Sequence, residues 1–410
     1  MSPSITVAVI TPCEQVIAPF NDPVSEVAVL DRTLRHLQEE AVAGAGLTLV
    51  DAPPTDAPYL AFSARTFVTE GVLERLLQQA PAPARAQVED PVWLENTGPL
   101  QQLDAPGLYE LGLFPSGAPP DYRQLPAVAL DLEFSYESPP AEHPAIAHAA
   151  PDKVAAGDAV IHQVDHWTHI LRINWLAMAA TIAREKRRFE GRFILMKIAL
   201  ILLVWSRARF SLNPFKIAAA LNQIGENVTI HPTAVVEGAV IGDDVIIGPF
   251  AVVRGSVIGK GAKIEEYSVV NMSAVGPGAR IGRRGTCNLC VLYPGAFFGA
   301  GNGYQACVFG RDSFAAWTTT VFDLSFDKHV KVMMNGERVD SGTFFLGAAI
   351  GHRAKIGGLV TLGYGAEVPN DAFVVGSSVS VLRRWEEGPG PHRVVDGVAR
   401  PVVRGKTGAG

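Results

Sequence analysis

Cysteine is scarce in this chain of 410 residues, which contains only Cys13, Cys287, Cys290 and Cys307. Four cysteines are too few for a disulfide scaffold of this size, and the chain is long enough to bury a full core in two or three domains. The N-terminus also lacks a basic segment followed by an apolar one, so we see no secretory signal. We therefore expect a cytoplasmic protein.

Positive charge is not in excess either. The chain has 35 Lys and Arg against 41 Asp and Glu, which gives a formal net charge of -6. Such a protein would not neutralise a phosphate backbone at scale, so we expect no nucleic-acid partner. Hydrophobic residues make up 48% of the chain, and its 40 glycines and 29 prolines suit a globular fold with many turns.

The apolar run from Ile194 to Trp205 falls short of a transmembrane segment, because it is brief and contains Lys197. Basic residues flank it within 184–209. One interpretation is an interfacial helix that makes peripheral contact with the inner face of an acidic membrane. The other is a buried helix that connects two domains or trimer subunits. Under either interpretation, we predict that residues 161–223 form a helical connector.

In residues 1–160, short apolar runs typical of buried strands alternate with runs whose apolar residues have helical spacing. We expect strands at 4–10 and 59–62, and helices at 29–37 and 72–77. This alternation favours a small α/β domain.

A repeat dominates residues 224–384. Starting with Ile224-Gly-Glu-Asn-Val-Thr and Ile230-His-Pro-Thr-Ala-Val, an aliphatic residue returns every six positions, with occasional five-residue steps. An amphipathic helix does not produce this period. Each hexapeptide forms a short strand and a turn, and three close a triangular coil with the aliphatic residue inside. We expect the glycine that often follows to provide a positive φ at the corner. The sequence therefore predicts a mixed fold, in which an α/β domain and a helical connector precede a left-handed parallel β-helix.

The repeat breaks at residues 311–345, and this excursion is longer than a structureless connection should be. Inside it, Asn335-Gly336 lies between two apolar runs, which predicts a β-hairpin. The repeat resumes at Ile350. Residues 385–410 form a tail rich in Gly, Pro and Arg, whose end at 405–410 we expect to be disordered.

At these repeats the chain resembles the hexapeptide-repeat acyltransferase superfamily. The resemblance implies a homotrimer, a donor that is acyl-CoA or acyl-carrier protein, and a sugar or nucleotide-sugar acceptor, with no bound cofactor and no metal. In that superfamily such excursions cover the acceptor site between subunits. We therefore expect Asn335 and Asp340 to contact the substrate.

The N-terminal block is similar to sugar-phosphate nucleotidyltransferases at residues 19–24, 59–70 and 165–174. It departs from them because no Gly-rich, Arg-containing loop follows the first strand, and because Ser63 stands where they have a metal-binding carboxylate. We interpret it as a degenerate domain that serves as scaffold or sugar-recognition surface.

Acyl transfer needs a general base, usually a histidine. The candidates are His329, on a predicted strand of the excursion near Asp323 and Asp327, and His352, at a corner of the resumed repeat. His231 is a weaker candidate, and each of the three could instead be a structural histidine.

Two further groups invite an interpretation as binding sites. Arg280, Arg283 and Arg284 could hold a phosphate of coenzyme A or a nucleotide, or form a solvated corner. The cysteines at 287, 290 and 307 could bind zinc with a histidine, but we favour packing, because position 287 falls where the repeat places an inward side chain.

We therefore expect an acyl- or acetyltransferase that acts on a sugar or nucleotide sugar. One alternative is a non-enzymatic trimeric scaffold or regulatory protein with an inactive nucleotidyltransferase-like domain. A second is an active sugar-phosphate nucleotidyltransferase.

Overall fold

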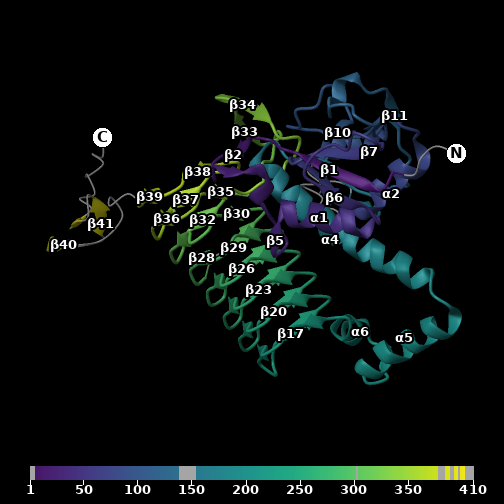
Figure 1. Ribbon diagram of the computed structural model, residues 1–410. Helices are drawn as coiled ribbons and strands as arrows, with labels where there is room; N and C mark the ends of the chain where they lie inside the picture. The colour runs from purple at the N-terminus through teal and green to yellow at the C-terminus, as the bar shows by residue number, and fades with distance from the viewer. Residues whose placement is uncertain are drawn as a thin grey trace.

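The computed structural model describes residues 5–137, 154–301, 303–376, 384–387, 392–395 and 398–401. Figure 1 shows an N-terminal α/β domain resting on a long stack of parallel coils, with helices leading from one to the other. The predicted mixed fold, with its left-handed parallel β-helix, is confirmed.

The N-terminal domain is built on one mixed sheet. Its strands are β1 (Val7–Thr11), β6 (Thr48–Val50), β7 (Tyr59–Ser63), β9 (Ala84–Gln87), β10 (Leu108–Phe114) and β11 (Ala127–Ala129). They lie in the order β11-β9-β10-β7-β1-β6. Strand β1 is parallel to β6 and β7, whereas β10 is antiparallel to β7 and β9. Short ribbons and turns surround the sheet: β2 (Val16–Ile17), β3 (Asp22–Pro23), β4 (Ala28–Val29), β5 (Arg32–Thr33), β12 (Ser135–Glu137) and β13 (Val154–Ala156).

Helices α1 (Leu34–Gly44), α2 (Glu70–Gln79) and α3 (Pro91–Thr97) complete the domain. The helix expected at 29–37 begins later, at Leu34, because β4 and β5 first pair as an antiparallel ribbon. Thr33 then caps α1, and its Oγ1 accepts a hydrogen bond from the backbone N–H of His36 at 3.3 Å.

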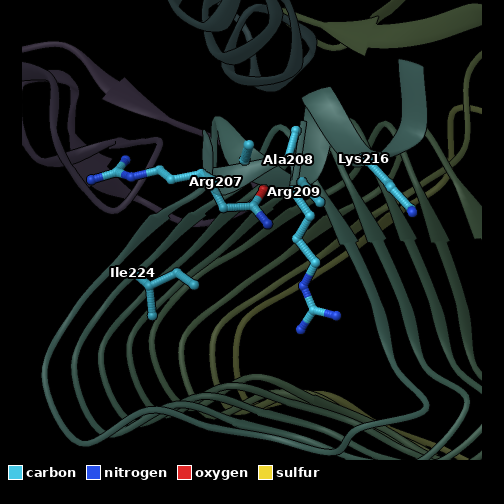
Figure 2. Close-up of a pocket in the computed structure, with 8 residues that line it drawn as sticks. Arg207, Ala208, Arg209, Lys216 and Ile224 are labelled. Carbon is cyan, nitrogen blue, oxygen red and sulfur yellow. The ribbon is translucent and has the colours of Figure 1, made fainter. Parts of the chain in front are cut away.

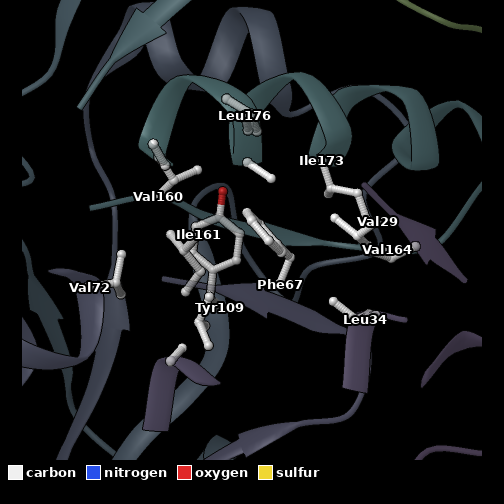
Figure 3. Close-up of a cluster of buried hydrophobic side chains, with 14 of the residues drawn as sticks. Val29, Leu34, Phe67, Val72, Tyr109, Val160, Ile161, Val164, Ile173 and Leu176 are labelled. Atoms are coloured by element: carbon white, nitrogen blue, oxygen red, sulfur yellow. The ribbon is translucent and has the colours of Figure 1, made fainter. Parts of the chain in front are cut away.

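The start of the predicted connector belongs to the N-terminal domain instead. Strand β14 (Ile161–Gln163) pairs with β8 (Thr66–Val68), and the first half of α4 (Trp167–Glu190) lies in the domain core. Figure 3 shows Ile173 and Leu176 of α4 facing Phe67 and other buried side chains of this core. What connects the two domains is therefore the end of α4, then α5 (Ile194–Arg207) and α6 (Pro214–Ala220).

The repeat forms a triangular prism with three faces. The first, which we call the docked face, contains β15 (Gln223–Ile224), β18 (Val240–Ile241), β21 (Val257–Ile258), β24 (Ala274–Val275), β27 (Val291–Leu292), β30 (Val308–Phe309), β35 (Ala349–Ile350) and β38 (Glu367–Val368). The second face contains β16 (Thr229–Ile230), β19 (Ile246–Ile247), β22 (Lys263–Ile264), β25 (Arg280–Ile281), β28 (Phe297–Phe298), β31 (Phe314–Ala315), β36 (Lys355–Ile356) and β39 (Phe373–Val374). The third face contains β17 (Val235–Glu237), β20 (Val252–Arg254), β23 (Val269–Asn271), β26 (Thr286–Asn288) and β29 (Gly303–Gln305), and after it come β32 (Thr320–Val321) and β37 (Thr361–Leu362).

One coil of the regular part takes 17 residues, so that Ile241 pairs with Ile258 on the docked face. This length corresponds to two six-residue steps and one five-residue step, as the spacing predicts. The inward aliphatic side chains form one continuous core along the prism.

The glycine that follows each inward residue has a different role from the one expected. At Gly242, Gly259 and Gly276 φ is not in the left-handed region, but a Cβ would lie 2.6–2.8 Å from backbone atoms of the next coil. These positions need glycine because the coils approach closely. The positive φ falls elsewhere in each coil, for example at Gly261 and at Phe250.

The excursion is shorter than expected. Strands β31 and β32 lie inside the predicted range 311–345, but they pair with β36 and β37 as regular parts of the prism. The six-residue pattern is weak in this range because the small Ala315 takes an inward position. The predicted hairpin is present: β33 (Lys331–Met334) and β34 (Glu337–Asp340) pair across Asn335 and Gly336, both with positive φ.

The tail contributes three short strands, β40 (Arg384–Trp385), β41 (His392–Val395) and β42 (Val398–Pro401), which form a small sheet. The disorder expected at 405–410 lies outside the described residues.

Candidate functional site

The hairpin of the excursion carries the first candidate base. His329 lies two residues before β33 rather than on a strand, and its side chain is 39% exposed. Its Nδ1 lies 3.2 Å from Oδ1 of Asp340, and its ring meets Phe344 edge-on at 4.5 Å. Asp340, rather than Asp323 or Asp327, is therefore the carboxylate that orients it. With a proton on Nδ1 shared with Asp340, Nε2 presents its lone pair, and it forms no hydrogen bond or ion pair in the described part of the chain.

The hairpin is fixed against the N-terminal domain. The Nδ1 atom of His166 accepts a hydrogen bond from the Thr168 backbone N–H, so its Nε2 donates to the carbonyl oxygen of Met333 at 3.0 Å. Trp167 donates from Nε1 to Glu367 of β38 at 2.8 Å. The start of α4 thus holds the hairpin and the last coils in one arrangement.

The second candidate base lies in the interface between the two domains. His352 is buried, and its Nδ1 accepts a hydrogen bond from the backbone N–H of Arg311 at 2.7 Å. Its Nε2 therefore carries the proton and donates to Oδ2 of Asp22 at 3.0 Å. Phe20 and Tyr293 pack on the ring. This geometry argues against His352 as the general base, because neither nitrogen is available to a substrate.

Asp22 is the centre of this interdomain junction. The Arg311 guanidinium forms an ion pair with it, and Asn370 donates from Nδ2 to the carbonyl oxygen of Phe20 at 2.6 Å. Burial raises the pKa of Asp22, but the hydrogen bonds from His352 and Arg311 and the positive charge of Arg311 outweigh it, so its pKa is lowered overall. The carboxylate therefore stays ionised inside the interface.

A second polar cluster lies at the carboxyl end of β7. Ser63 is buried there, and the Arg65 guanidinium lies between two carboxylates. Its Nε donates to Glu110 at 2.9 Å and its Nη1 donates to Asp165 at 2.9 Å. Burial raises the pKa of Glu110, but Arg65 lowers it by a larger amount, so the net shift of this pKa is downward. Asp165 is more deeply buried, and there the effect of burial exceeds that of Arg65 and the hydrogen bonds, so the pKa of Asp165 is raised. A fixed guanidinium thus occupies the place between carboxylates that a divalent cation would need.

The three predicted phosphate-binding arginines lie at a different edge of the prism. Arg280 pairs with Glu265 and stacks on Phe297, and Arg283 pairs with Glu266. Arg284 forms no ion pair in the described part of the chain. These residues flank the corner between the second and third faces, whereas the excursion leaves the corner between the third face and the docked face. Within one chain, the arginines and His329 are therefore not brought together.

The surroundings of the remaining candidate site residues indicate structural roles. Cys287, Cys290 and Cys307 are free and buried inside the prism, where burial raises the pKa of the thiols at 290 and 307. His231 is exposed, and its Nδ1 lies 2.9 Å from the hydroxyl of Thr233. Within the described ranges, no group of three or more His, Cys, Asp or Glu side chains is arranged to hold a metal ion.

Sequence reasoning missed Asp22 and Arg65. Asp22 is 330 residues from its partner His352, and nothing local marks the pair. Asp340 could have been paired with His329 from the sequence. A two-residue turn at Asn335-Gly336 sets Lys331 opposite Asp340, two residues from the histidine.

The family match to known proteins lies in the prism. Residues 223–255 and 238–271 match the family described as bacterial transferase hexapeptide (six repeats). The solved structure of the polysialic acid O-acetyltransferase OatWY aligns with 46% of this chain and 93% of that one, at 17% sequence identity and a TM-score of 0.18. No curated protein matches this sequence.

Proposed function

We propose that this protein transfers an acyl group from a thioester, of coenzyme A or of a carrier protein, to a hydroxyl or amino group of a sugar or nucleotide sugar. His329 serves as the general base. The observation that carries the proposal is the His329–Asp340 pair, which presents a free Nε2 on a hairpin that leaves a hexapeptide prism. The family match to residues 223–271 supports a transferase.

The chemistry follows from this pair. Nε2 of His329 takes the proton from the acceptor as its oxygen or nitrogen attacks the thioester carbonyl carbon. The tetrahedral intermediate collapses, the carbon–sulfur bond breaks, and the proton passes from the imidazolium to the leaving thiolate. Asp340 holds the ring in the correct tautomer and stabilises its protonated form, as orienting carboxylates do elsewhere.

The surroundings of the base suit a thioester. Exposed apolar side chains belong to the same excursion and hairpin, namely Phe322, Phe326, Met333 and Val339. Such side chains can cover the pantetheine arm or an acyl chain and exclude water from the carbonyl. Asn335, at the hairpin tip, is placed to contact the acceptor in this proposal.

A complete site requires more than one copy of the chain in this proposal. Large apolar side chains are exposed along the second face and its adjoining corner, including Ile246, Phe250, Tyr267, Phe314 and Trp317. An exposed apolar surface of this extent is typical of an interface. In this proposal three prisms pack through this surface, and Arg284 of one copy binds a donor phosphate at the site of another. The mass of the protein in solution measures whether it is a trimer.

Nucleotidyl transfer is disfavoured by Arg65. That reaction needs a divalent cation to neutralise the nucleoside triphosphate. Here the guanidinium already neutralises Glu110 and Asp165.

The experiment compares His329→Asn with His36→Asn. His36 is a matched control, because it is exposed on α1 and lies 3.5 Å from Glu40. Release of free thiol is measured from acetyl-CoA and longer acyl-CoA thioesters in the presence of sugars and nucleotide sugars. We expect H329N to lower kcat about 10²–10⁴-fold, the range that a general base contributes. The rise in melting temperature with the donor should persist in H329N, because the donor still binds.

Two results would overturn the proposal. One is an H329N variant that turns over as fast as H36N. The other is a wild-type protein whose melting temperature responds to no thioester, free or on a carrier protein, which would favour the non-enzymatic scaffold.

A further inference from the structure

No side chain of helix α5 is fully buried against the rest of the chain. Figure 1 shows it held away from both the N-terminal domain and the prism, beside α6. Phe193 and Leu195 are 86% and 79% exposed, and the apolar surface continues through Ile198, Ile201 and Leu202. Soluble proteins rarely expose apolar surface of this extent without a partner.

The charge of the same segment has one sign. Residues 191–225 contain no Asp or Glu, although the whole chain has a net charge of -6. Within the described ranges, no ion pair is formed by any of the five cations of this segment, Arg192, Lys197, Arg207, Arg209 and Lys216. Their charge is therefore available to an anionic partner.

Three of the basic residues immediately before this segment, Arg184, Arg187 and Arg188, already form ion pairs. Arg184 and Arg188 lie within 3.8 Å and 3.4 Å of Glu70. Arg187 is 2.7 Å from Asp158. These arginines bind the end of α4 to the N-terminal domain, so the contact region expected at 184–209 is better placed at 191–224.

The segment also contains a basic cavity of about 550 Å³, between the end of α5, α6 and the first coil. Arg207, Arg209 and Lys216 line it together with the apolar Ile224. Figure 2 shows these three long side chains spreading from the helices in different directions near the end of the prism. A cavity with cations and apolar walls suits the phosphate of a lipid headgroup next to its acyl chains.

We propose that residues 191–224, the docking segment, bind the surface of an anionic phospholipid membrane. The 14 residues of α5 extend about 21 Å, short of the roughly 30 Å hydrocarbon core. No helix in the described ranges combines the length and apolarity needed to cross a bilayer. The helix therefore lies in the interface plane, with its apolar side chains among the acyl chains and the cations at the phosphates. A second copy of the segment is a poorer partner, because it would bring cations together with no acid between them.

The experiment is flotation of the full chain with vesicles of pure phosphatidylcholine, and with vesicles that also contain phosphatidylglycerol. We expect binding to the anionic vesicles. The variant R207Q/R209Q should bind them about 25-fold more weakly, since each cation near the surface contributes about fivefold. The matched control R32Q/R123Q removes two exposed cations of the N-terminal domain and should bind as the wild type does.

A second readout locates the contact on α5. Trp205 is 37% exposed, and its emission should shift to the blue when the wild-type protein binds anionic vesicles. The variant W205F should bind equally and lose that part of the shift. The proposal is overturned if the two charge variants bind anionic vesicles equally, or if the blue shift survives in W205F. It is also overturned if the double variant Ile194→Asn with Ile201→Asn converts an oligomer to monomers while leaving vesicle binding intact. None of these outcomes touches the thiol-release assay, so this proposal can fail independently of acyl transfer.

Discussion

Replacing Asp22 by Asn tests how the two domains are joined. The substitution keeps the shape of the side chain but removes the charge that holds His352 and Arg311. Breaking a buried pair costs about 3–5 kcal/mol, because the remaining polar groups stay buried without their partner. Arg311 is partly exposed, so water replaces some of the lost interaction. We therefore expect D22N to lower the free energy of unfolding by about 3 kcal/mol.

The assay is urea unfolding at neutral pH, with the matched control Asp371→Asn. Asp371 forms a bidentate pair with Arg353, at 2.6 and 2.7 Å, but both side chains are exposed. An exposed pair contributes about 0–1 kcal/mol, so D371N should be close to wild type. Equal destabilisation by the two variants would refute the reasoning, because burial would then make no difference.

The same junction has a pH dependence with a definite sign. The pKa of Asp22 in the folded protein lies below its ordinary value of 3.8, so the folded state holds the ionised form more tightly than the unfolded chain does. The stabilisation is present above about pH 4 and is lost as the pH falls through the folded pKa. The stabilities of wild type and D22N should therefore converge in acid. A difference that stays constant down to that range would contradict this assignment.

Two further changes test the cluster of Arg65, Glu110 and Asp165 and the prism corners. Arg65→Met leaves Glu110 and Asp165 without their cation, and we expect a loss of about 3–5 kcal/mol in urea unfolding; an unchanged midpoint would show that the guanidinium is not needed there. Gly276→Ala places a Cβ 2.6 Å from the carbonyl oxygen of Leu292 and should destabilise the prism by more than Gly261→Ala, whose Cβ meets nothing but whose positive φ costs about 1 kcal/mol. The reverse order in thermal melting would mean that the coils can separate to admit a methyl group.

The prism could be predicted because its requirement is local and repeated. Every coil must bury inward side chains such as Ile241 and Ile258, and the corresponding position recurs along the chain. The prediction of the coils failed where the inward residue is small, as at Ala315. The predicted role of the glycines was wrong where a neighbouring coil, rather than a positive φ, leaves no room for a side chain.

The candidate site divides in the same way. The hairpin at Asn335-Gly336 is encoded by two adjacent residues, and its register brings Asp340 to His329. The role of His352 cannot be predicted from residues near it in the sequence. It depends on Asp22 arriving from the other domain, which turns a candidate base into a buried hydrogen-bond donor.

The sequence by itself thus determined the class of fold, the six-residue period, the hairpin and an apolar, basic segment before the prism. Only the tertiary structure decided which of two histidines stays accessible, which arginines are already neutralised, and that Arg65 pairs with Glu110 and Asp165. The physical reason is that periodic burial and turn geometry depend on neighbours in the chain. Burial and pairing of a charge depend instead on side chains that are distant in sequence, such as Asp22 from His352 and Asp165 from Arg65.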